Sequence, residues 1–235
     1  MTDDGGGATV LPWQRAAAVD ALAGRATWPH ALLVAGPRGI GKRTLALEFA
    51  RSLLCEAPAA DGLACGACAS CGYVAAGQHP DLQVVEPFTV DDDGEVKALD
   101  AIPVDRIRAL IDWALLSGHR GRAKVAVVVP AEALNAAAAN ALLKTLEEPP
   151  AGTFLLLVSH QPGRVPATLR SRCRRFPAPQ PDGDAALHWL EAQGVPDPAA
   201  VLAQAGGAPL LARLLADPAA QDERRQWLAA LAKPK

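Results

Sequence analysis

The sequence is poor in aromatic side chains, and this shortage limits how a core can be built. Phenylalanine, tryptophan and tyrosine make up 4% of the 235 residues, while half of all residues are hydrophobic. Leucine, valine and alanine must therefore supply most of the buried surface. A chain of this length and composition suits one large domain, or a main domain with a small appendage, and excludes a disordered, collagen-like or coiled-coil chain.

Long apolar runs and a strong charge excess are also missing. No apolar run approaches the ~18–20 residues that cross a bilayer. Residues 1–7 are acidic and glycine-rich, unlike the basic and then apolar layout of a signal peptide. We therefore expect a cytoplasmic protein with no membrane contact. The net charge is −2, so any contact with nucleic acid must come from a local basic patch or from partner chains.

Short apolar runs alternate with helical patterns over most of the chain. The runs predict strands at residues 31–35, 82–85, 125–129 and 154–158. Helices are predicted at 11–25 and 42–54, at 103–115, where residues 104, 107, 110, 111 and 115 form one apolar face, and in a stretch that ends at Glu148. Buried strands separated by helices are typical of a parallel sheet covered on both faces, so the predicted fold class is α/β. The acidic run 91–95 is interpreted as an exposed hairpin tip or loop.

A proline-rich segment at residues 177–181 separates two kinds of sequence. Three prolines in five residues make a stiff extended linker. Beyond it only helices are predicted, at residues 184–193, 198–205, 209–216 and 221–231. We expect a first domain of residues 1–177, a small all-helical domain of residues 178–216, and the start of a further helical domain at 217–235.

Residues Gly36–Lys42 match the phosphate-loop pattern G-x-x-x-x-G-K, between a predicted strand and a predicted helix. In such loops, glycines such as Gly36, Gly39 and Gly41 let backbone N–H groups face a phosphate, and the lysine, here Lys42, meets its outer oxygens. The sequence therefore predicts a loop of the phosphate-binding type.

The magnesium ligands of such a loop are not in their usual places. Arg43 stands where Ser or Thr holds Mg²⁺, and Thr44 is displaced by about 100° around the helix. The run 125–129 contains no carboxylate, and Glu132 lies three residues past its end. We expect a site that has lost its catalytic metal, unless a different strand carries the acidic residue.

Four of the five cysteines are spaced C-x9-C-x2-C-x2-C in a predicted loop. Disulfides are disfavoured in the cytosol, whereas four thiolates satisfy a tetrahedral Zn²⁺. The spacing predicts a closed structural zinc site, with an iron–sulfur cluster or unconnected cysteines as alternatives. His79 is interpreted as a loop or core residue rather than a competing ligand. The expected ligands are Cys55, Cys65, Cys68 and Cys71.

Four arginines gather in the segment Leu169–Arg175, directly after a proline-initiated turn. On composition alone, such a cluster indicates a solvated basic surface.

Together, four segments resemble the bacterial DNA polymerase III clamp-loader family: Gly36–Lys42, the four-cysteine insert, Asn140–Pro150 and Ser171–Cys173. The resemblance covers nearly all of residues 11–215. It implies an AAA+ fold, in which a RecA-like α/β domain with a zinc-binding insert is followed by a small helical lid. It also implies that residues 217–235 begin a helical collar domain and that the chain is truncated.

Within this family, three positions separate the gamma/tau-type motor subunits from the delta-prime type. Motors carry Lys-Thr or Lys-Ser in the loop, Asp-Glu after the second motif strand, and a nucleotide-sensing arginine in the helical domain. Here these positions are Lys42-Arg43, Val129-Pro130 and Pro209. The resemblance therefore favours a catalytically inert delta-prime-type subunit, with doubtful ATP binding and no magnesium site, over an active gamma/tau-type ATPase. The third hypothesis, a zinc-dependent nucleic-acid-binding module, is disfavoured by the scarce aromatics and negative net charge.

The resemblance also implies roles for residues and partners. It supports the four cysteines as zinc ligands and makes Arg172 a finger that reaches the ATP of a neighbouring subunit. Cys173 is then a buried residue and not a nucleophile. The implied partners are gamma/tau and delta subunits in a hetero-pentamer, and the sliding clamp and primed DNA through that complex.

Overall fold

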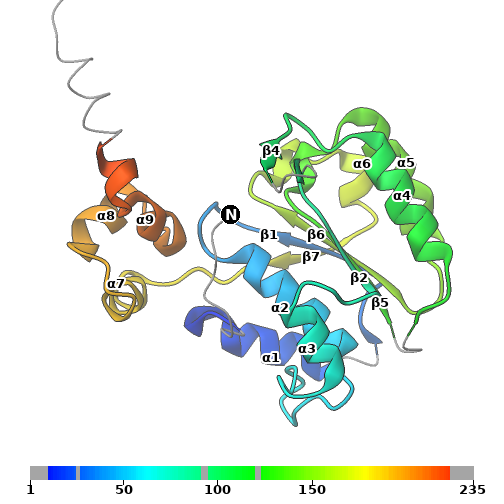
Figure 1. Ribbon diagram of the computed structural model, residues 1–235, viewed down its shortest axis with the longest axis horizontal. Helices are drawn as coiled ribbons and strands as arrows, with labels where there is room; N and C mark the ends of the chain where they lie inside the picture. Colours follow the sequence, from blue (N-terminus) through cyan, green and yellow to red (C-terminus); the bar gives the residue numbers. More distant parts are fainter. Residues whose placement is uncertain (1–9, 25–26, 91–94, 120–122, 223–235) are drawn as a thin grey trace, which may run out of the picture.

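A five-stranded parallel sheet with the strand order β2-β5-β6-β1-β7 organises the protein (Figure 1). The computed structural model describes residues 10–24, 27–90, 95–119 and 123–222. The three inner strands are almost wholly buried, while the two outer strands are partly exposed. The strands are β1 (Ala31–Ala35), β2 (Leu82–Val85), β5 (Lys124–Val128), β6 (Thr153–Ser159) and β7 (Arg174–Pro177). The predicted parallel α/β sheet is confirmed.

Helices cover both faces of the sheet (Figure 1). Alternate strand residues such as Val34, Val127 and Val158 pack with helices α1 and α2, and the residues between them pack with α4 and α5. The helices of this domain are α1 (Arg15–Ala23), α2 (Lys42–Leu54), α3 (Ala69–Ala75), α4 (Val104–Leu115), α5 (Ala136–Glu147) and α6 (Ala167–Arg170), with single 3₁₀ turns at Pro12–Gln14, Ala131–Ala133 and Pro162–Arg164.

Three of the ten aromatic residues meet where α2 packs on the sheet. Phe49 on α2 is fully buried. Its ring makes edge-to-face contacts with Trp28 and Phe176, at centroid distances of 5.0 and 5.4 Å. The three rings join α2, the segment before β1 and the edge strand β7, so they anchor one layer of the domain to the sheet.

The structure contains elements that the sequence pattern did not predict. Strand β7 has no apolar run because it is an edge strand, with only Phe176 half-buried toward the core. Helix α3 lies inside the predicted cysteine-rich loop. Strands β3 (Phe88–Val90) and β4 (Val96–Ala98) form an antiparallel hairpin. Most of the predicted acidic tip, residues 91–94, lies outside the described residues.

The apolar face predicted for α4 is only partly correct. Ile107 and Leu110 are buried, but Leu115 is 68% exposed. Ala114, four residues after Leu110, takes the buried position of the last turn instead. The predicted buried stripe therefore ends one residue early.

Three helices follow the sheet, as predicted: α7 (Gly183–Ala192), α8 (Pro198–Gln204) and α9 (Pro209–Leu215). They share their own small core, to which Leu190, Val201 and Ala212 belong. Among the described residues, no single helix is long and apolar enough to cross a membrane, and only the sharply bent pair α8 and α9 reaches that length and apolarity together. The predicted helix 221–231 lies almost entirely outside the described residues, and the proposed domain boundaries stay a prediction.

Candidate functional site

The phosphate-loop segment lies between β1 and α2, where the sequence predicted it. Gly39 and Gly41 adopt positive φ angles of 81° and 88°, which favour glycine, and α2 begins at Lys42. The Lys42 side chain is almost fully buried, and its Nζ donates a hydrogen bond to the carbonyl of Pro37. Burial lowers the pKa of Lys42 to about 8; nearby Glu132 opposes this shift and Arg38 adds to it.

Neighbouring segments pack against this loop on two sides. The Gly39 carbonyl accepts a hydrogen bond from the N–H of Leu210, in the first turn of α9, at 3.0 Å. The Ile40 carbonyl accepts from Gln14 Nε2 at 2.8 Å and from Trp13 Nε1 at 3.1 Å. A Cβ atom at Gly39 would lie 2.8 Å from the Cβ of Leu211. The loop is therefore held between the N-terminal segment and the helical unit.

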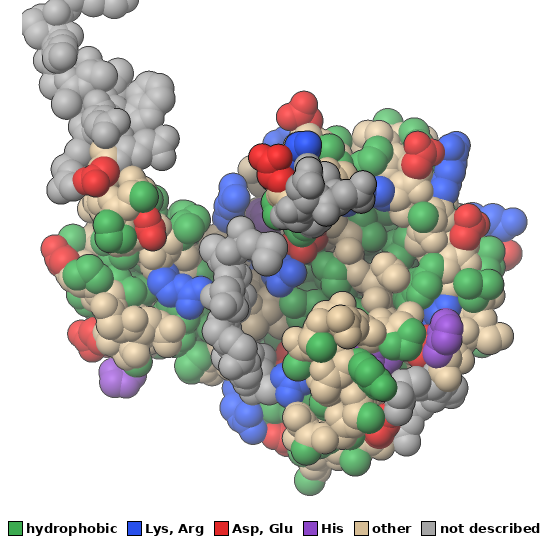
Figure 2. Space-filling model, in the orientation of Figure 1, with side chains coloured by type: hydrophobic (Ala, Val, Ile, Leu, Met, Phe, Trp, Pro, Cys, Tyr) green, Lys and Arg blue, Asp and Glu red, His purple; other side chains and the backbone are tan. Residues whose placement is uncertain are grey.

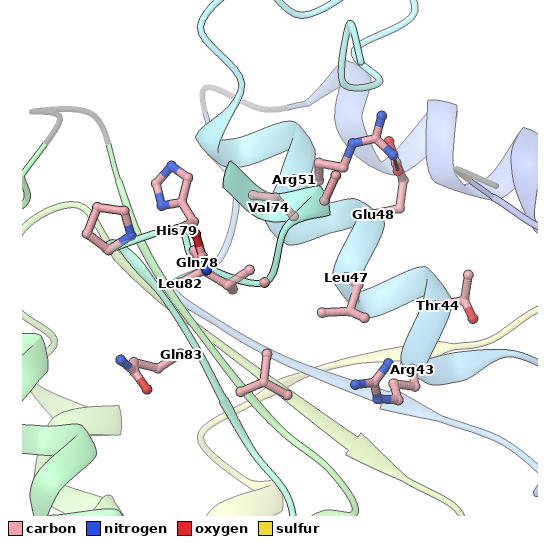
Figure 3. A pocket seen from close by; sticks show the side chains of 14 residues that line it. Arg43, Thr44, Leu47, Glu48, Arg51, Val74, Gln78, His79, Leu82 and Gln83 are labelled. Atoms are coloured by element: carbon pink, nitrogen blue, oxygen red, sulfur yellow. Dashed lines mark hydrogen bonds and ion pairs between the residues drawn. The ribbon is translucent and has the colours of Figure 1, made fainter. Parts of the chain in front are cut away.

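Arg43 and Thr44 line the same cavity beside α2 (Figure 3). Arg43 forms a two-pronged ion pair with Glu86, with Nε and Nη2 each 3.0 Å from a carboxylate oxygen. A guanidinium held by a carboxylate is not a metal ligand, since it offers only N–H donors. The side chain that follows Lys42 thus connects the start of α2 to the residue after β2.

A carboxylate does reach the loop, although none lies on β5. Glu132 Oε1 accepts backbone hydrogen bonds from His160 at 2.9 Å and Gln161 at 3.1 Å. Among the described residues, Glu132 Oε2 and His160 Nδ1 are buried without a hydrogen-bond partner. Burial lowers the pKa of His160 to about 4; Lys42 and Arg38 add to this shift, and Glu132 opposes it. Lys42, Glu132 and His160 therefore form one electrostatic cluster.

The four cysteines predicted as ligands converge on one point. Their sulfur atoms all lie within 4.8 Å of one another, and four of the Sγ–Sγ distances are 3.5, 3.7, 3.9 and 4.0 Å. A tetrahedral ion with ~2.3 Å bonds to sulfur needs sulfurs ~3.8 Å apart, so the donor set fits a single metal ion. Cys55 follows the end of α2, Cys68 is the N-cap of α3 and Cys71 lies in its first turn.

Backbone groups support these sulfurs. The N–H groups of Cys65, Cys68 and Cys71 point at the sulfurs of Cys55, Cys65 and Cys68, at 3.3, 3.4 and 3.4 Å. Such donors stabilise the thiolate form that binds a metal.

His79 is a core residue, as predicted. It is buried, its Nε2 lies 2.6 Å from Ser70 Oγ and its Nδ1 accepts the N–H of Asp81. Both ring nitrogens are thus engaged with partners other than a metal. These contacts tie the end of the cysteine segment to the start of β2.

Arg172 differs from the other arginines of its cluster. Its Nε donates to Glu147 Oε1 at 2.7 Å, Nη2 contacts the same oxygen, and Nη1 donates to the Thr168 carbonyl at 2.9 Å. Its side chain is 33% exposed, whereas Arg170, Arg174 and Arg175 are exposed residues. The contact joins two of the four segments that carry the family resemblance, Asn140–Pro150 and Ser171–Cys173.

Cys173 packs partly against the core, and burial raises the pKa of its thiol to about 12. At neutral pH it is protonated, so it is a packing residue rather than a nucleophile.

Comparison with known proteins places the chain in a family. A sequence model described as "DNA polymerase III, delta subunit" matches residues 17–181. The chain belongs to this family. It is 45% identical to the DNA polymerase III subunit delta' of Pseudomonas aeruginosa over 224 aligned residues. The aligned region covers 93% of this chain and 65% of that protein. The Escherichia coli subunit delta' is 41% identical over 162 residues, which is 68% of this chain and 46% of that protein.

A tau subunit is less similar than these two delta' subunits. The tau subunit of Salmonella typhimurium is 35% identical over 162 residues, which is 69% of this chain and 23% of that protein. The predicted resemblance to the delta-prime type is therefore confirmed. The chain spans about half to two thirds of the length of these delta' relatives.

A solved structure confirms the fold. The DNA polymerase III gamma subunit-related protein of Thermotoga maritima superimposes with a TM-score of 0.52 at 18% identity, over 85% of this chain and 69% of that one. The parallel sheet followed by α7, α8 and α9 is thus the AAA+ fold with its helical lid, as predicted.

Sequence reasoning missed three of the partners that shape these sites. Glu86 and His160 lie in no motif, and Glu147 lies in the segment Asn140–Pro150 without any local sign of its partner. Each lies far along the chain from the residue that it contacts. Only for His160 is there a usable signal: it follows a predicted strand, and the carboxyl ends of parallel strands meet at one edge of the sheet.

We predict that His160 makes folding stability depend on pH. Its pKa lies below the ordinary 6.5, so the fold binds fewer protons than the unfolded chain between pH 6.5 and about pH 4. Above pH 6.5 the imidazole is neutral in both states, so it does not lower the free energy of unfolding. As the pH falls from 6.5 to about 4, the unfolded chain binds a proton that the fold excludes, and the free energy of unfolding decreases. Since one pKa unit is worth about 1.4 kcal/mol, we expect a loss of about 2 kcal/mol between pH 7 and pH 4.5.

The measurement is urea unfolding at both pH values. His160→Gln removes this part of the pH dependence, whereas His188→Gln, on the exposed surface of α7, keeps it. An unchanged pH dependence in His160→Gln would show that the burial of this imidazole is not the cause.

Proposed function

We propose that this chain is the delta-prime-type subunit of a cytoplasmic DNA polymerase III clamp loader, the complex that opens the sliding clamp and places it on primed DNA. Its partners are gamma/tau and delta subunits in a hetero-pentamer. It does not hydrolyse ATP on its own, and it supplies Arg172 to the ATP site of a neighbouring subunit. Membership of the family supports the assignment, and the ordered guanidinium of Arg172 is the observation that carries the trans-acting role.

The state of the phosphate loop supports the absence of hydrolysis. Lys42 Nζ is bonded to the loop's own Pro37 carbonyl, and Arg43 is paired with Glu86. Pro209, at the position of the motor's sensing arginine, is buried at the start of the helix that packs on Gly39. Without a hydroxyl for Mg²⁺, charge that develops on a γ-phosphate has no cation to meet it.

One observation favours the alternative, a gamma/tau-type ATPase. Glu132 acts electrostatically on Lys42 and keeps one buried oxygen without a partner among the described residues. A carboxylate at this place is chemically able to hold a cation. The two hypotheses are separated by measuring hydrolysis directly.

Zinc is the proposed metal of the cysteine cluster. Four sulfurs around one point suit a single tetrahedral ion, whereas a cluster of several irons needs its ligands farther apart. All four positions are filled by protein sulfur, so the ion has no open position for catalysis. Its role is to hold the end of α2 against α3.

The arrangement of Arg172 supports a finger that is ordered before assembly. Glu147 and the Thr168 carbonyl hold the guanidinium on the surface, with a third of the side chain still exposed. A planar fork of donors matches phosphate oxygens, and lysine lacks that fork. Because an exposed ion pair is worth at most about 1 kcal/mol, a phosphate group can displace Glu147.

The first prediction from the proposed function concerns the metal. Protein purified without added zinc is expected to contain about one equivalent of zinc per chain, the stoichiometry of a single tetrahedral site. Cys68→Ser lowers the zinc content and loosens the insert, while Cys173→Ser, outside the cluster, leaves both unchanged. Metal analysis and proteolysis of the insert provide the readouts. Stoichiometric iron, or a well-folded insert without metal, contradicts the assignment.

The second prediction concerns hydrolysis. The isolated chain is expected to show no Mg²⁺-dependent ATPase activity, and Arg43→Thr alone does not create it, since no carboxylate ends β5. Phosphate release is the measurement. Activity that is abolished by both Lys42→Ala and Glu132→Gln would establish the gamma/tau-type alternative.

The third prediction concerns Arg172. In the assembled complex, Arg172→Ala, and largely Arg172→Lys, lowers clamp- and DNA-stimulated ATPase and clamp loading. Fingers supplied in trans contribute ~10³–10⁵ to the rate in well-studied cases. Folding and metal content stay intact.

Arg170→Ala, Arg174→Ala and Arg175→Ala are the matched controls, because a merely basic surface predicts similar losses for all four arginines. Normal loading by a complex that carries Arg172→Ala would leave this subunit with a scaffolding role only.

A further inference from the structure

The outer edge of β2 carries backbone groups that are not used by the sheet. The Asp81 and Val85 carbonyls accept hydrogen bonds from Val125 and Val129, each at 2.9 Å, so the odd-numbered residues face β5. In a parallel pair the intervening residues point their N–H and C=O groups the other way. Among the described residues, no strand pairs with the Leu82 carbonyl or with the N–H and carbonyl of Val84.

A cavity flanks this edge on each face of the sheet. One, of about 680 Å³, lies between α2, α3 and β2 (Figure 3). The other, of about 390 Å³, lies between β2 and α4. Gln83 and Val84 line both. The space-filling view shows the surface hollowed between the cysteine segment and α4, with hydrophobic side chains in the hollow (Figure 2).

The cavities combine apolar walls with basic rims. Leu47, Val74 and Leu82 contribute to the first, and Ala109 and Leu110 to the second. The charged side chains that line them are Arg43, Arg51 and Arg106, with Glu48 as the one acid among the described lining residues. Glu48 is buried and bonded to Arg51 and Ser52. Glu86, directly after β2, pairs with Arg43 in the same way. Three arginines thus face two carboxylates, which leaves an excess of one positive charge at this edge, in a chain with a net charge of −2.

We propose that an extended, acidic segment of a partner protein adds to β2 as a sixth strand of the sheet. Its backbone bonds to Leu82 and Val84, and successive apolar side chains enter the two cavities alternately. Its flanking carboxylates meet Arg106, and they compete with Glu86 and Glu48 for Arg43 and Arg51. An unpaired edge supplies the affinity of such strand addition, and pockets for alternate side chains supply its specificity.

A peptide fits this surface better than a nucleic acid does. Trp113, the aromatic ring at the second cavity, donates its Nε1–H to the Pro80 carbonyl, and Lys124 Nζ lies 4.4 Å from the ring centroid. The ring is thus covered on a face that a base would use for stacking. The unpaired N–H and carbonyl groups have no counterpart in a sugar–phosphate chain, whereas a β-strand matches them.

The test uses the full chain and a library of fluorescein-labelled nonapeptides, Asp-Asp-Thr-X-X-X-Thr-Asp-Asp, in which each X is a large apolar residue. Fluorescence anisotropy is expected to find binding members. N-methylation of the central residue, or replacement of the aspartates by lysine, weakens them by about tenfold or more, because a backbone bond or the charge match is lost. Bound peptide slows amide hydrogen exchange at Val84. If no library member binds, the proposal is wrong.

Variants locate the binding to this edge. Ala75→Trp fills the first cavity and Ala109→Trp the second, both from exposed positions; each is expected to abolish peptide binding. Ala76→Trp, which lines neither cavity, keeps it. Arg106→Glu weakens binding, whereas Arg108→Glu, on the same helix and paired with Asp105, does not.

Unchanged peptide binding in both cavity-filling variants would place the peptide elsewhere and overturn the proposal. Single-stranded oligothymidine that binds the chain, displaces the peptide and loses affinity in Ala75→Trp would make this edge a nucleic-acid surface instead.

Discussion

The parallel pairing of β1, β5 and β6 is the constraint on which the phosphate-loop region depends. Parallel strands present their carboxyl ends at one edge of the sheet, so the loop after β1, Glu132 after β5 and His160 after β6 are brought together although they are far apart in the chain. The N–H of Gly36 also donates to the Ser159 carbonyl, which fixes the start of the loop against β6. A different strand order would separate these residues in space, although the sequence motifs themselves would be unchanged.

Burial is the main influence on the lowered pKa values in this cluster. Lys42 and His160 both lose solvation, and burial is the largest cause of the lowered pKa of each. Glu132 favours the charged form of both residues, yet one of its oxygens and one His160 nitrogen have no hydrogen-bond partner in the part of the chain that the structure describes. Groups held in this way cost stability, since a buried polar atom without a hydrogen bond loses its water. The contact of α9 with Gly39 packs the helical unit against the loop that carries Lys42.

The four-cysteine cluster is linked through α3 and His79 to the outer strand β2 of the sheet. Cys68 and Cys71 define the first turn of α3, and α3 supplies Val74 and Ala75 to the wall beside β2. The His79 ring links Ser70 on α3 to the turn that enters β2. An ion held by the four cysteines would therefore stabilise more than its own loop, because the helix that follows forms one side of a cavity.

Local pattern determined much of this protein. Apolar periodicity placed the inner strands and most helices to within about one residue. The spacing of glycines and cysteines located the glycine-rich loop between β1 and α2 and the four cysteines whose sulfurs converge. Those signals are local, since they depend on neighbours along the chain. The pairs Arg43–Glu86, Arg172–Glu147 and Glu132–His160 join residues 25 to 43 positions apart, and the edge strand β7 carries no apolar run. Tertiary structure alone decided them, because strand order and helix packing choose which distant side chains meet.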